Sequence, residues 1–232
     1  MLRLTDRLQV MADCIRETES VCDIGTDHGY LGIYLKEKNL ERTIILTDVS
    51  RPSLEKARSN VKKLSSYELD LRLGNGLEVL KESETDVITI AGMGGLLMCD
   101  ILACDLHKAH SFSRYVLQPR NHAGNLRHYL LSNGFVIERE HLVKEGRFIC
   151  EILEVSNGTS EVPEFSPESI EMEIPESTVH MKSPLVKDYL SRKLSREKRV
   201  LFNLYASTHI SKEKVELTKH NIAYINSLID RL

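Results

Sequence analysis

Short apolar runs alternate with amphipathic stretches through the first 156 of the 232 residues, and this alternation constrains the fold more than any other feature. The predicted strands are Ser20–Gly25, Thr43–Val49, Tyr67–Gly74, Asp86–Gly92, Arg114–Pro119, Phe135–Lys144 and Arg147–Ser156. The predicted helices are Tyr30–Lys38, Arg51–Lys63, Gly76–Lys81, Leu96–Leu106 and Asn125–Asn133. Strands that alternate with helices predict an α/β domain, in which helices cover both faces of a parallel sheet.

The last two predicted strands differ from the others, because only the tight turn at Glu145-Gly146 separates them. A connection this short joins antiparallel strands, so we expect a closing β-hairpin and a seven-stranded mixed sheet. This layout resembles the Rossmann-like fold of class I methyltransferases, which use S-adenosylmethionine (SAM). Ordinary dinucleotide dehydrogenases do not close with such a hairpin.

The distribution of charge divides the chain into three parts. Residues 1–156 carry 20 basic and 23 acidic side chains, residues 157–181 carry six acidic and no basic ones, and residues 182–232 carry 11 basic and five acidic ones. We expect a SAM-binding methyltransferase domain at 1–156, an acidic linker with little packed structure at 157–181, and a basic helical coiled-coil domain at 182–232. A basic tail can follow a polyanion, although a solvated helical surface has the same composition.

Within the tail we expect two antiparallel helices with a break near Ser207–Thr208. In the second helix one face should gather five apolar residues, which are Val215, Ile222, Ile225, Ile229 and Leu232. No run approaches the ~20 apolar residues of a membrane span. Charges interrupt the N-terminal segment, unlike a signal peptide, and five irregularly spaced cysteines argue against a disulfide framework. We therefore expect a cytoplasmic protein with reduced thiols and no membrane contact.

The stretch "DIGTDHGY" ends the first predicted strand in a glycine loop that carries Asp23 and Asp27. A dinucleotide-binding loop would read G-x-G-x-x-G, and here Asp27 replaces the second glycine. A carboxylate there would repel a pyrophosphate. SAM has no phosphate and carries a sulfonium and an ammonium cation, which favour carboxylates nearby. The loop therefore favours SAM, while capping of the next helix by Thr26 or Asp27 is the structural alternative.

Three other strand ends carry candidate ligand-binding residues. Asp48 ends the second strand, where an acidic residue hydrogen-bonds ribose in Rossmann-like sites; N-capping, for which Ser50 also fits, is the alternative. Asn75 follows the third strand, where its amide could bind adenine or only form a turn. The fourth strand ends in Ala91-Gly92-Met93-Gly94-Gly95, and three glycines there would let the backbone approach a ligand closely.

The segment "LQPRNHAGNLRHYL" follows the fifth strand and supplies polar side chains that could meet a base edge or phosphates, or simply make the loop and helix polar. These candidates are Gln118, Arg120, Asn121 and Arg127.

The segment "LLMCDILACDLHKAH" carries residue types that can bind a metal. Its candidate ligands are Cys99, Cys104, His107 and His110. The segment reads as a helix with buried cysteines and exposed histidines, and its spacing matches no metal-binding pattern. We therefore expect no metal.

Five stretches, "LTDRLQVMAD", "DIGTDHGYL", "GNGLEVL", "ITIAGMGG" and "VLQPRNHAGNLRHYL", resemble in order the motifs of the bacterial tRNA (adenine(22)-N(1))-methyltransferases, the TrmK family. The resemblance implies a Rossmann-like SAM domain, a small C-terminal helical domain, and methylation of ring nitrogen 1 of adenine 22 in tRNA. It implies SAM contacts at Asp23, Gly25, Asp27, His28, Asp48, Asn75, Gly76, Ala91, Gly92, Met93 and Gly94.

The resemblance also places Arg7 near the mouth of the active site. Two positions depart from the family pattern, because Asn75 stands where members often have Asp, and Arg120 follows Gln118-Pro119 where some have Asn. Asn121 could substitute for the latter. Ring nitrogen 1 has its own lone pair, so no proton must leave before methyl transfer. Asp27 is the candidate catalytic residue, because a carboxylate would stabilise the cationic product or accept a proton from the exocyclic amine. The alternative is that Asp27 contacts only the cofactor.

Two other function classes fit the sequence. The first is a SAM- or RNA-binding protein without catalysis, and the second is a methyltransferase for a small molecule or a protein. The basic tail favours RNA, whereas the acidic main domain mildly favours the small-molecule or protein substrate.

Overall fold

The computed structural model describes residues 2–207 and 211–232. Their helices and strands run in the order α1 (Asp6–Asp13), β1 (Val21–Ile24), α2 (Tyr30–Lys38), β2 (Ile44–Asp48), α3 (Arg51–Leu64), β3 (Asp70–Leu73), η1 (Gly76–Val79), β4 (Val87–Met93), α4 (Gly95–Ala103), α5 (Leu106–Ser111), β5 (Arg114–Pro119), α6 (Ala123–Ser132), β6 (Phe135–Glu145), β7 (Phe148–Asn157), α7 (Ile170–Glu173), η2 (Glu176–His180), α8 (Val186–Ala206) and α9 (Lys212–Ile229).

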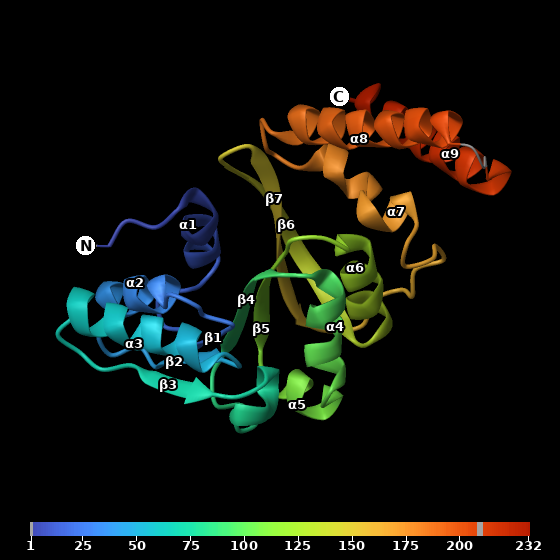
Figure 1. The fold of residues 1–232 in the computed structure, drawn as a ribbon. Coiled ribbons are helices and arrows are strands. Elements are labelled where there is room, and N and C mark those ends of the chain that lie inside the picture. Colours follow the sequence, from blue (N-terminus) through green and yellow to red (C-terminus); the bar gives the residue numbers. More distant parts are fainter. Residues whose placement is uncertain (1, 208–210) are drawn as a thin grey trace.

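The described residues form a seven-stranded sheet in the order β3-β2-β1-β4-β5-β7-β6 (Figure 1). The strands from β3 to β5 pair in parallel, and β7 pairs antiparallel with both β5 and β6. The predicted closing hairpin is therefore confirmed. Strand order reverses between β1 and β4, which is where ligands bind in open α/β sheets.

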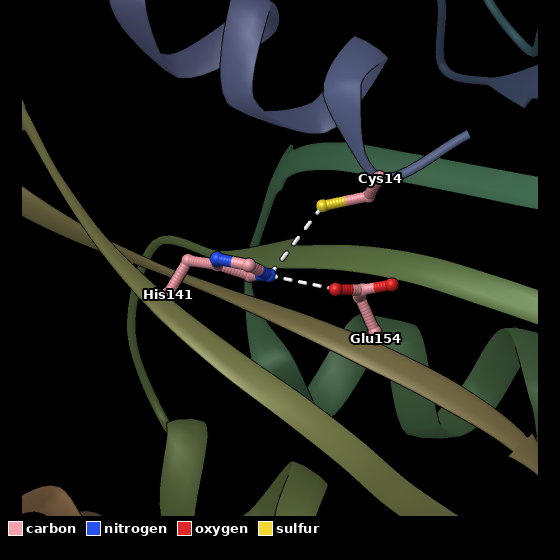
Figure 2. Close-up of side chains that lie close together, drawn as sticks. All are labelled: Cys14, His141 and Glu154. Carbon is pink, nitrogen blue, oxygen red and sulfur yellow. Dashed lines mark hydrogen bonds and ion pairs between the residues drawn. The ribbon is translucent and has the colours of Figure 1, made fainter. Parts of the chain in front are cut away.

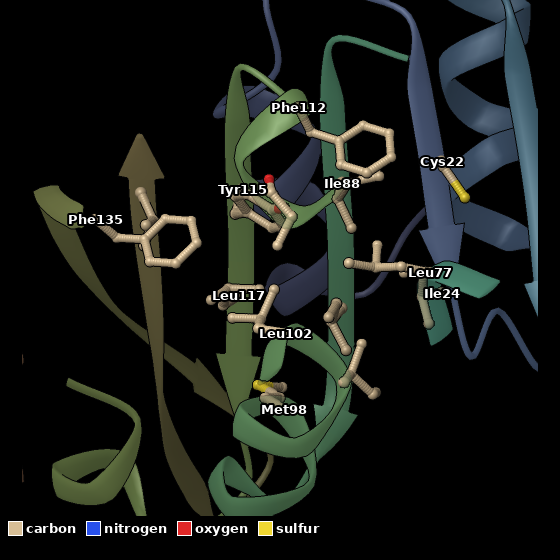
Figure 3. Close-up of a cluster of buried hydrophobic side chains, with 14 of the residues drawn as sticks. Cys22, Ile24, Leu77, Ile88, Met98, Leu102, Phe112, Tyr115, Leu117 and Phe135 are labelled. Atoms are coloured by element: carbon tan, nitrogen blue, oxygen red, sulfur yellow. The ribbon is translucent and has the colours of Figure 1, made fainter. Parts of the chain in front are cut away.

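Helices bury both faces of the sheet, and successive strand residues point to opposite faces. Val21, Ile44 and Val87 pack with α1, α2 and α3 on one face. Their sequence neighbours Cys22, Ile45 and Ile88 pack with α4, α5 and α6 on the other (Figure 3). This explains why these strands read as continuous apolar runs.

The C-terminal helices dock on the sheet domain through a third apolar cluster. Leu142 of β6 meets Val186, Tyr189 and Leu190 of α8 and Ile225 of α9. In Figure 1 the β6–β7 hairpin extends beyond the sheet, and its tip lies between α1 and α8. The helical region is therefore attached to the edge of the sheet that carries the hairpin.

The acidic segment 157–181 is more ordered than its composition predicts. It contains α7 and η2, and it buries Ile170 and Ile174 against α8, α9 and the hairpin, while Met172 of α7 is buried as well. The expectation of little packed structure is thus wrong for residues 170–180. The cause is tertiary, because the apolar residues between the glutamates become buried only when the C-terminal helices are in place.

The helices of the tail lie side by side, as expected from the sequence (Figure 1). Helix α8 ends at Ala206 and α9 begins at Lys212, while Thr208 of the predicted break lies outside the described residues. On α9, Val215, Ile225 and Leu228 are buried, whereas Leu232 lies beyond the end of the helix and is exposed. Among the described helices, none is long and apolar enough to cross a membrane.

Candidate active site

A cavity of about 540 Å³ opens at the carboxyl ends of β1, β2 and β4, and we call it the strand-end cavity. Ten of the eleven residues expected to contact SAM line it, namely Asp23, Gly25, Asp27, His28, Asp48, Asn75, Gly76, Ala91, Gly92 and Met93. The exception is Gly94, which is the N-cap of α4 and faces the side chain of Asn121. The motifs at four strand ends, those of β1, β2, β3 and β4, therefore converge on one cavity.

Asp23 anchors the glycine loop that forms one wall of this cavity. Its carboxylate accepts hydrogen bonds of 2.7 Å from the hydroxyls of Thr26 and Thr89. Burial raises the pKa of Asp23, and these two hydrogen bonds oppose the rise by favouring the ionised form. The side chain thus ties the loop after β1 to the neighbouring strand β4.

The loop itself turns through left-handed backbone conformations. Gly25 and Gly29 have φ of 71°, and Asp27 between them has φ of 47°. Gly29 is the N-cap of α2, and no side chain caps that helix. Helix capping by Thr26 or Asp27 is therefore excluded as the reason for these residues, which leaves their position in the cavity wall.

Asp27 presents its carboxylate to the cavity with about half of its side chain exposed, 52%. Its Oδ2 lies 3.3 Å from His28 Nε2, and its Oδ1 lies 3.5 Å from Lys56 Nζ. The carboxylate is therefore accessible to a ligand and is not consumed by a buried ion pair.

Asp48 holds two loops together from the end of β2. Its Oδ1 accepts from the backbone N–H of Ser50 at 2.8 Å, and its Oδ2 accepts from that of Asp27 at 3.2 Å. The N-cap of α3 is Ser50, whose hydroxyl accepts from Ser53 N–H. The capping alternative for Asp48 is therefore wrong, and its carboxylate lines the cavity instead.

The lining chemistry fits SAM better than a phosphate-bearing cofactor. Three carboxylates, from Asp23, Asp27 and Asp48, reach the described lining, and Arg7 is its one guanidinium. Such a surface repels phosphate and favours the cationic groups of SAM. The volume is in the range of small-molecule and cofactor sites, about 300–1,000 Å³.

A second, larger space of about 920 Å³ separates the sheet domain from α8 and α9, and we call it the interdomain groove. Arg7 and Gly92 line both this groove and the strand-end cavity, so the two spaces meet there. Three further residues predicted to meet the substrate also line the groove, namely Gln118, Arg120 and Asn121.

Gln118 organises the rim where the two spaces meet. Its side chain is 2% exposed, and its Oε1 accepts from Arg7 Nη1 at 2.9 Å and from Gly92 N–H at 3.0 Å. Arg7 Nε in turn donates to Glu145 Oε2 at 2.6 Å. These bonds join the N-terminal helix, β4, β5 and the β6–β7 hairpin around one opening.

Sequence reasoning missed the groove residues contributed by the hairpin and the tail. These include Glu145, Phe148, Lys193 and Arg196. The turn at Glu145-Gly146 and the basic tail were both visible in the sequence. The sequence did not show that these segments converge with Gln118, because that depends on how the C-terminal helices dock.

Arg127 does not line the groove, which corrects its inclusion among the substrate-binding candidates. It is 2% exposed and donates to Glu140 at 3.0 and 2.7 Å and to Glu151 at 2.6 Å. Its Nη1 also donates to the carbonyls of Met172 and Glu173. The guanidinium is therefore occupied within the protein, where it joins α6, the hairpin and α7.

The same network extends into α8. Tyr189 donates its hydroxyl to Glu151 at 2.8 Å, and Lys193 Nζ lies 3.4 Å from Glu151 and 2.7 Å from Glu173. Burial alone would raise the pKa of Glu151, but Lys193 and Arg127 lower it from the usual 4.5 to about 2. Charge and not only apolar contact therefore joins the tail to the sheet domain.

This lowered pKa predicts how acid affects stability. Because Glu151 has a lower pKa in the folded state, the stability it contributes is complete above pH 4.5 and is lost as the pH falls toward about 2. We expect Glu151→Gln to be less stable than wild type at pH 6 and to lose stability less steeply below pH 4.5. Urea unfolding from pH 6 to pH 3 measures how steeply the free energy of unfolding falls with pH in wild type and in the variant. Equal slopes in the two proteins would contradict a lowered pKa of Glu151.

The cysteines and histidines of the α4–α5 segment do not gather into one site. Cys99 contacts the carbonyl of Asn125, Cys104 contacts Glu78, and His107 contacts Glu82. His110 bonds Asn157 and the carbonyl of Asn133. The four candidate ligands thus have four separate sets of partners.

Among the described residues, one group of potential metal ligands does come together, at Cys14, His141 and Glu154 (Figure 2). His141 Nε2 lies 2.7 Å from Glu154 Oε1 and 3.6 Å from Cys14 Sγ. Arg114 also donates to Glu154 at 2.8 Å, and this guanidinium would oppose a metal cation. The group serves as a polar contact between the end of α1 and the hairpin strands.

Comparison with known proteins shows a matching family model, a similar curated protein and similar solved structures, of which two are described below. Residues 4–153 match the family model described as a methyltransferase domain. A Bacillus subtilis protein named tRNA (adenine(22)-N(1))-methyltransferase is 35% identical over 159 residues, which are 68% of this chain and 66% of that relative, just under two thirds of its length.

The two structures resemble this chain over its whole length. The B. subtilis M1A22 tRNA methyltransferase TrmK has a TM-score of 0.84 at 26% identity, covering 99% of this chain and 100% of that one. The M. capricolum TrmK, in complex with the cofactor product S-adenosyl-homocysteine, has a TM-score of 0.80 at 27% identity, covering 98% of each chain. The similarity therefore includes the C-terminal helices.

Proposed function

This chain belongs to the methyltransferase-domain family and, within it, to the tRNA (adenine(22)-N(1))-methyltransferases, and on that premise we propose that it transfers the methyl group of SAM to ring nitrogen 1 of adenine 22 in tRNA. One observation supports this most strongly. The strand-end cavity and the interdomain groove meet at Arg7 and Gly92. A methyl donor in the cavity and a base in the groove would then face each other across one opening.

SAM, when bound, supplies an electrophilic methyl group. The residues proposed to hold it are those that line the strand-end cavity, with Asp48 on the ribose hydroxyls and Asn75 beside the adenine. Asp23 keeps the glycine loop in place through Thr26 and Thr89. Gly94 lies behind the wall, against Asn121, and would act by positioning the turn into α4.

The groove residues are proposed to place the target base. Ring nitrogen 1 needs no deprotonation, so most of the rate would come from alignment of the nitrogen with the methyl group. Gln118 fixes Arg7 and Gly92 at the opening, while Arg120 and Asn121 are exposed and available to tRNA. Asp27 remains the candidate to stabilise the cationic product, because its carboxylate is accessible in the cavity.

The direct test of this function uses the whole protein with radiolabelled SAM and bulk bacterial tRNA. We expect label in tRNA, and nuclease digestion should place it in 1-methyladenosine at position 22. No transfer to tRNA would overturn the proposal. If a bacterial cell extract replaces the tRNA, transfer to a protein or small molecule instead would support the other substrate class. Because both substrates occur in the cytoplasm, we propose that location for the protein.

We also propose that the tail binds the tRNA backbone. Deleting residues 182–232 would expose the apolar cluster around Leu142 and break the Glu151 network, so charge neutralisation is the cleaner test. Arg196 lines the groove, and Arg199 is exposed one turn further along α8. Together, Arg196→Gln and Arg199→Gln should weaken tRNA binding and flatten its dependence on log salt by about 1 per lost phosphate contact, with SAM affinity unchanged.

The matched control neutralises Lys62 and Lys63, which are exposed on α3, far from α8 (Figure 1). Filter binding at several salt concentrations measures both variants. If the α8 variant and the α3 variant have the same salt dependence as wild type, the tail does not contact the backbone through these arginines.

A further inference from the structure

We propose that the ring of Phe148 is a stacking platform for an unpaired tRNA base at the outer end of the interdomain groove. This inference rests on the proposed function, which supplies the tRNA. Phe148 is the first residue of β7, it lines the groove, and it is 61% exposed. Exposure alone does not indicate a ligand, because single exposed apolar side chains are common on protein surfaces. The position of the ring in the groove, its direction and its charged neighbours support the proposal.

The strand geometry shows which way the ring points. In β7, Ile152 and Cys150 pack on the side of the sheet that carries α1. Because alternate residues of a strand share a face, Phe148 continues this row beyond the edge of the core. It also pairs directly with Glu145 in the hairpin, and directly opposed residues share a face. Glu145 bonds Arg7 at the rim, so the ring lies on the same side as the opening.

The hairpin tip that carries the ring is held from two sides. On one side Glu145 bonds Arg7 at 2.6 Å. On the other, Arg192 of α8 donates to the backbone carbonyl of Arg147 at 2.5 Å, while Asp188 fixes the guanidinium of Arg192 at 2.9 Å. A ring on a fixed hairpin loses little conformational freedom when a ligand stacks on it.

The surroundings favour a nucleic acid base over an apolar ligand. The Arg147 guanidinium lies 5.0 Å from the centre of the Phe148 ring, so one face already has a cation–π partner and the other can accept a base. Arg120 and Arg196 line the same groove and could meet phosphates. A flat aromatic surface beside cations is the arrangement with which proteins bind single-stranded nucleic acids.

An unpaired base must be available for this contact, and the reaction would provide one. Ring nitrogen 1 is hidden in a paired or stacked adenine, so the enzyme must open the tRNA locally at a cost of a few kcal/mol. Stacking on Phe148 would offset part of that cost. The stacked base would be either adenine 22 before it enters the opening, or a neighbouring base that is displaced together with it.

The test compares Phe148→Leu, which keeps an apolar side chain, and Phe148→Trp, which keeps an aromatic one. We expect Phe148→Leu to weaken tRNA affinity roughly 5- to 150-fold, the range for loss of one stacked base. Phe148→Trp should retain affinity near that of wild type. SAM affinity, measured separately by calorimetry, should be unchanged in both. Equal tRNA affinity in the Leu variant and wild type would overturn the proposal.

A spectroscopic measurement separates stacking from a general loss of fit. Synthetic tRNA would carry 2-aminopurine at position 22 or at either neighbour, and stacking on an aromatic ring quenches its fluorescence. We expect at least one position to show quenching with wild type and Phe148→Trp that Phe148→Leu does not show. Identical quenching with all three proteins at every position would contradict stacking.

These measurements are independent of catalysis. If wild type binds tRNA but transfers no methyl group, the proposed function fails while the Phe148 comparison can still be read from affinity. If wild type methylates tRNA and Phe148→Leu has unchanged affinity and kinetics, the function stands and the stacking proposal fails.

Discussion

Arg127→Ala should lower the free energy of unfolding by about 3–5 kcal/mol, the range for removing one partner of a buried ion pair. Arg127 is the shared partner of Glu140 and Glu151, whose side chains are each only 10% exposed. Without Arg127, Glu140 has no ion-pair partner among the described residues, and Lys193 is the one cation among them still paired with Glu151. Urea unfolding at pH 7 measures the loss.

Arg120→Ala is the matched control, since the two arginines lie in the same sequence segment. Arg120 is exposed, so its removal should change stability by less than about 0.5 kcal/mol. We expect the opposite ranking for tRNA affinity in the folded proteins, with Arg120→Ala the weaker binder. A stable Arg127→Ala protein with weakened tRNA binding would restore Arg127 to the substrate-binding residues.

Asp48→Asn should weaken SAM binding roughly 10- to 150-fold, while the protein stays folded. The range corresponds to one lost hydrogen bond to a charged group, about 1.5–3 kcal/mol. The asparagine can keep Oδ1 as the acceptor for Ser50 N–H, but it loses the charge and places an amide NH₂ where Oδ2 accepts from Asp27 N–H. Isothermal calorimetry with SAM measures the affinity directly.

Asp13→Asn provides the control for this prediction. Asp13 is an exposed carboxylate on α1 that accepts from Gln9 and lies outside the lining of the strand-end cavity. Its replacement should leave SAM affinity at the wild-type value. If Asp48→Asn binds SAM as tightly as this control, Asp48 serves only to join the two loops.

The sequence was sufficient to predict the strand-end cavity because parallel strands place their carboxyl ends along one edge of a sheet. Asp23, Asp48 and Gly92 each end a predicted strand, and all three line the cavity. At β2, the structure assigns the N-cap of α3 to Ser50, while Asp48 lines the cavity.

The local sequence pattern does not determine whether a polar side chain on a helix points to solvent or into the protein. Arg127 lies one helical turn after the exposed loop of Arg120 and Asn121, and its sequence context is polar. Only the docking of α7 and α8 on the hairpin shows that its side chain points inward to Glu140 and Glu151. The packed structure within the acidic segment 157–181 could not be predicted for the same reason, because its buried isoleucines need partners from helices later in the chain.

The sequence alone determined the α/β class, the closing hairpin and the carboxylate-lined cavity, because each of these follows from contacts between neighbouring strands or within one turn. The interdomain groove, the inward position of Arg127 and the exposed ring of Phe148 were decided only by tertiary structure. They depend on how α8 and α9 lie against the hairpin. That arrangement comes from one apolar cluster, which reaches from Leu142 to Leu228, and one charge network, which reaches from Arg127 to Lys193.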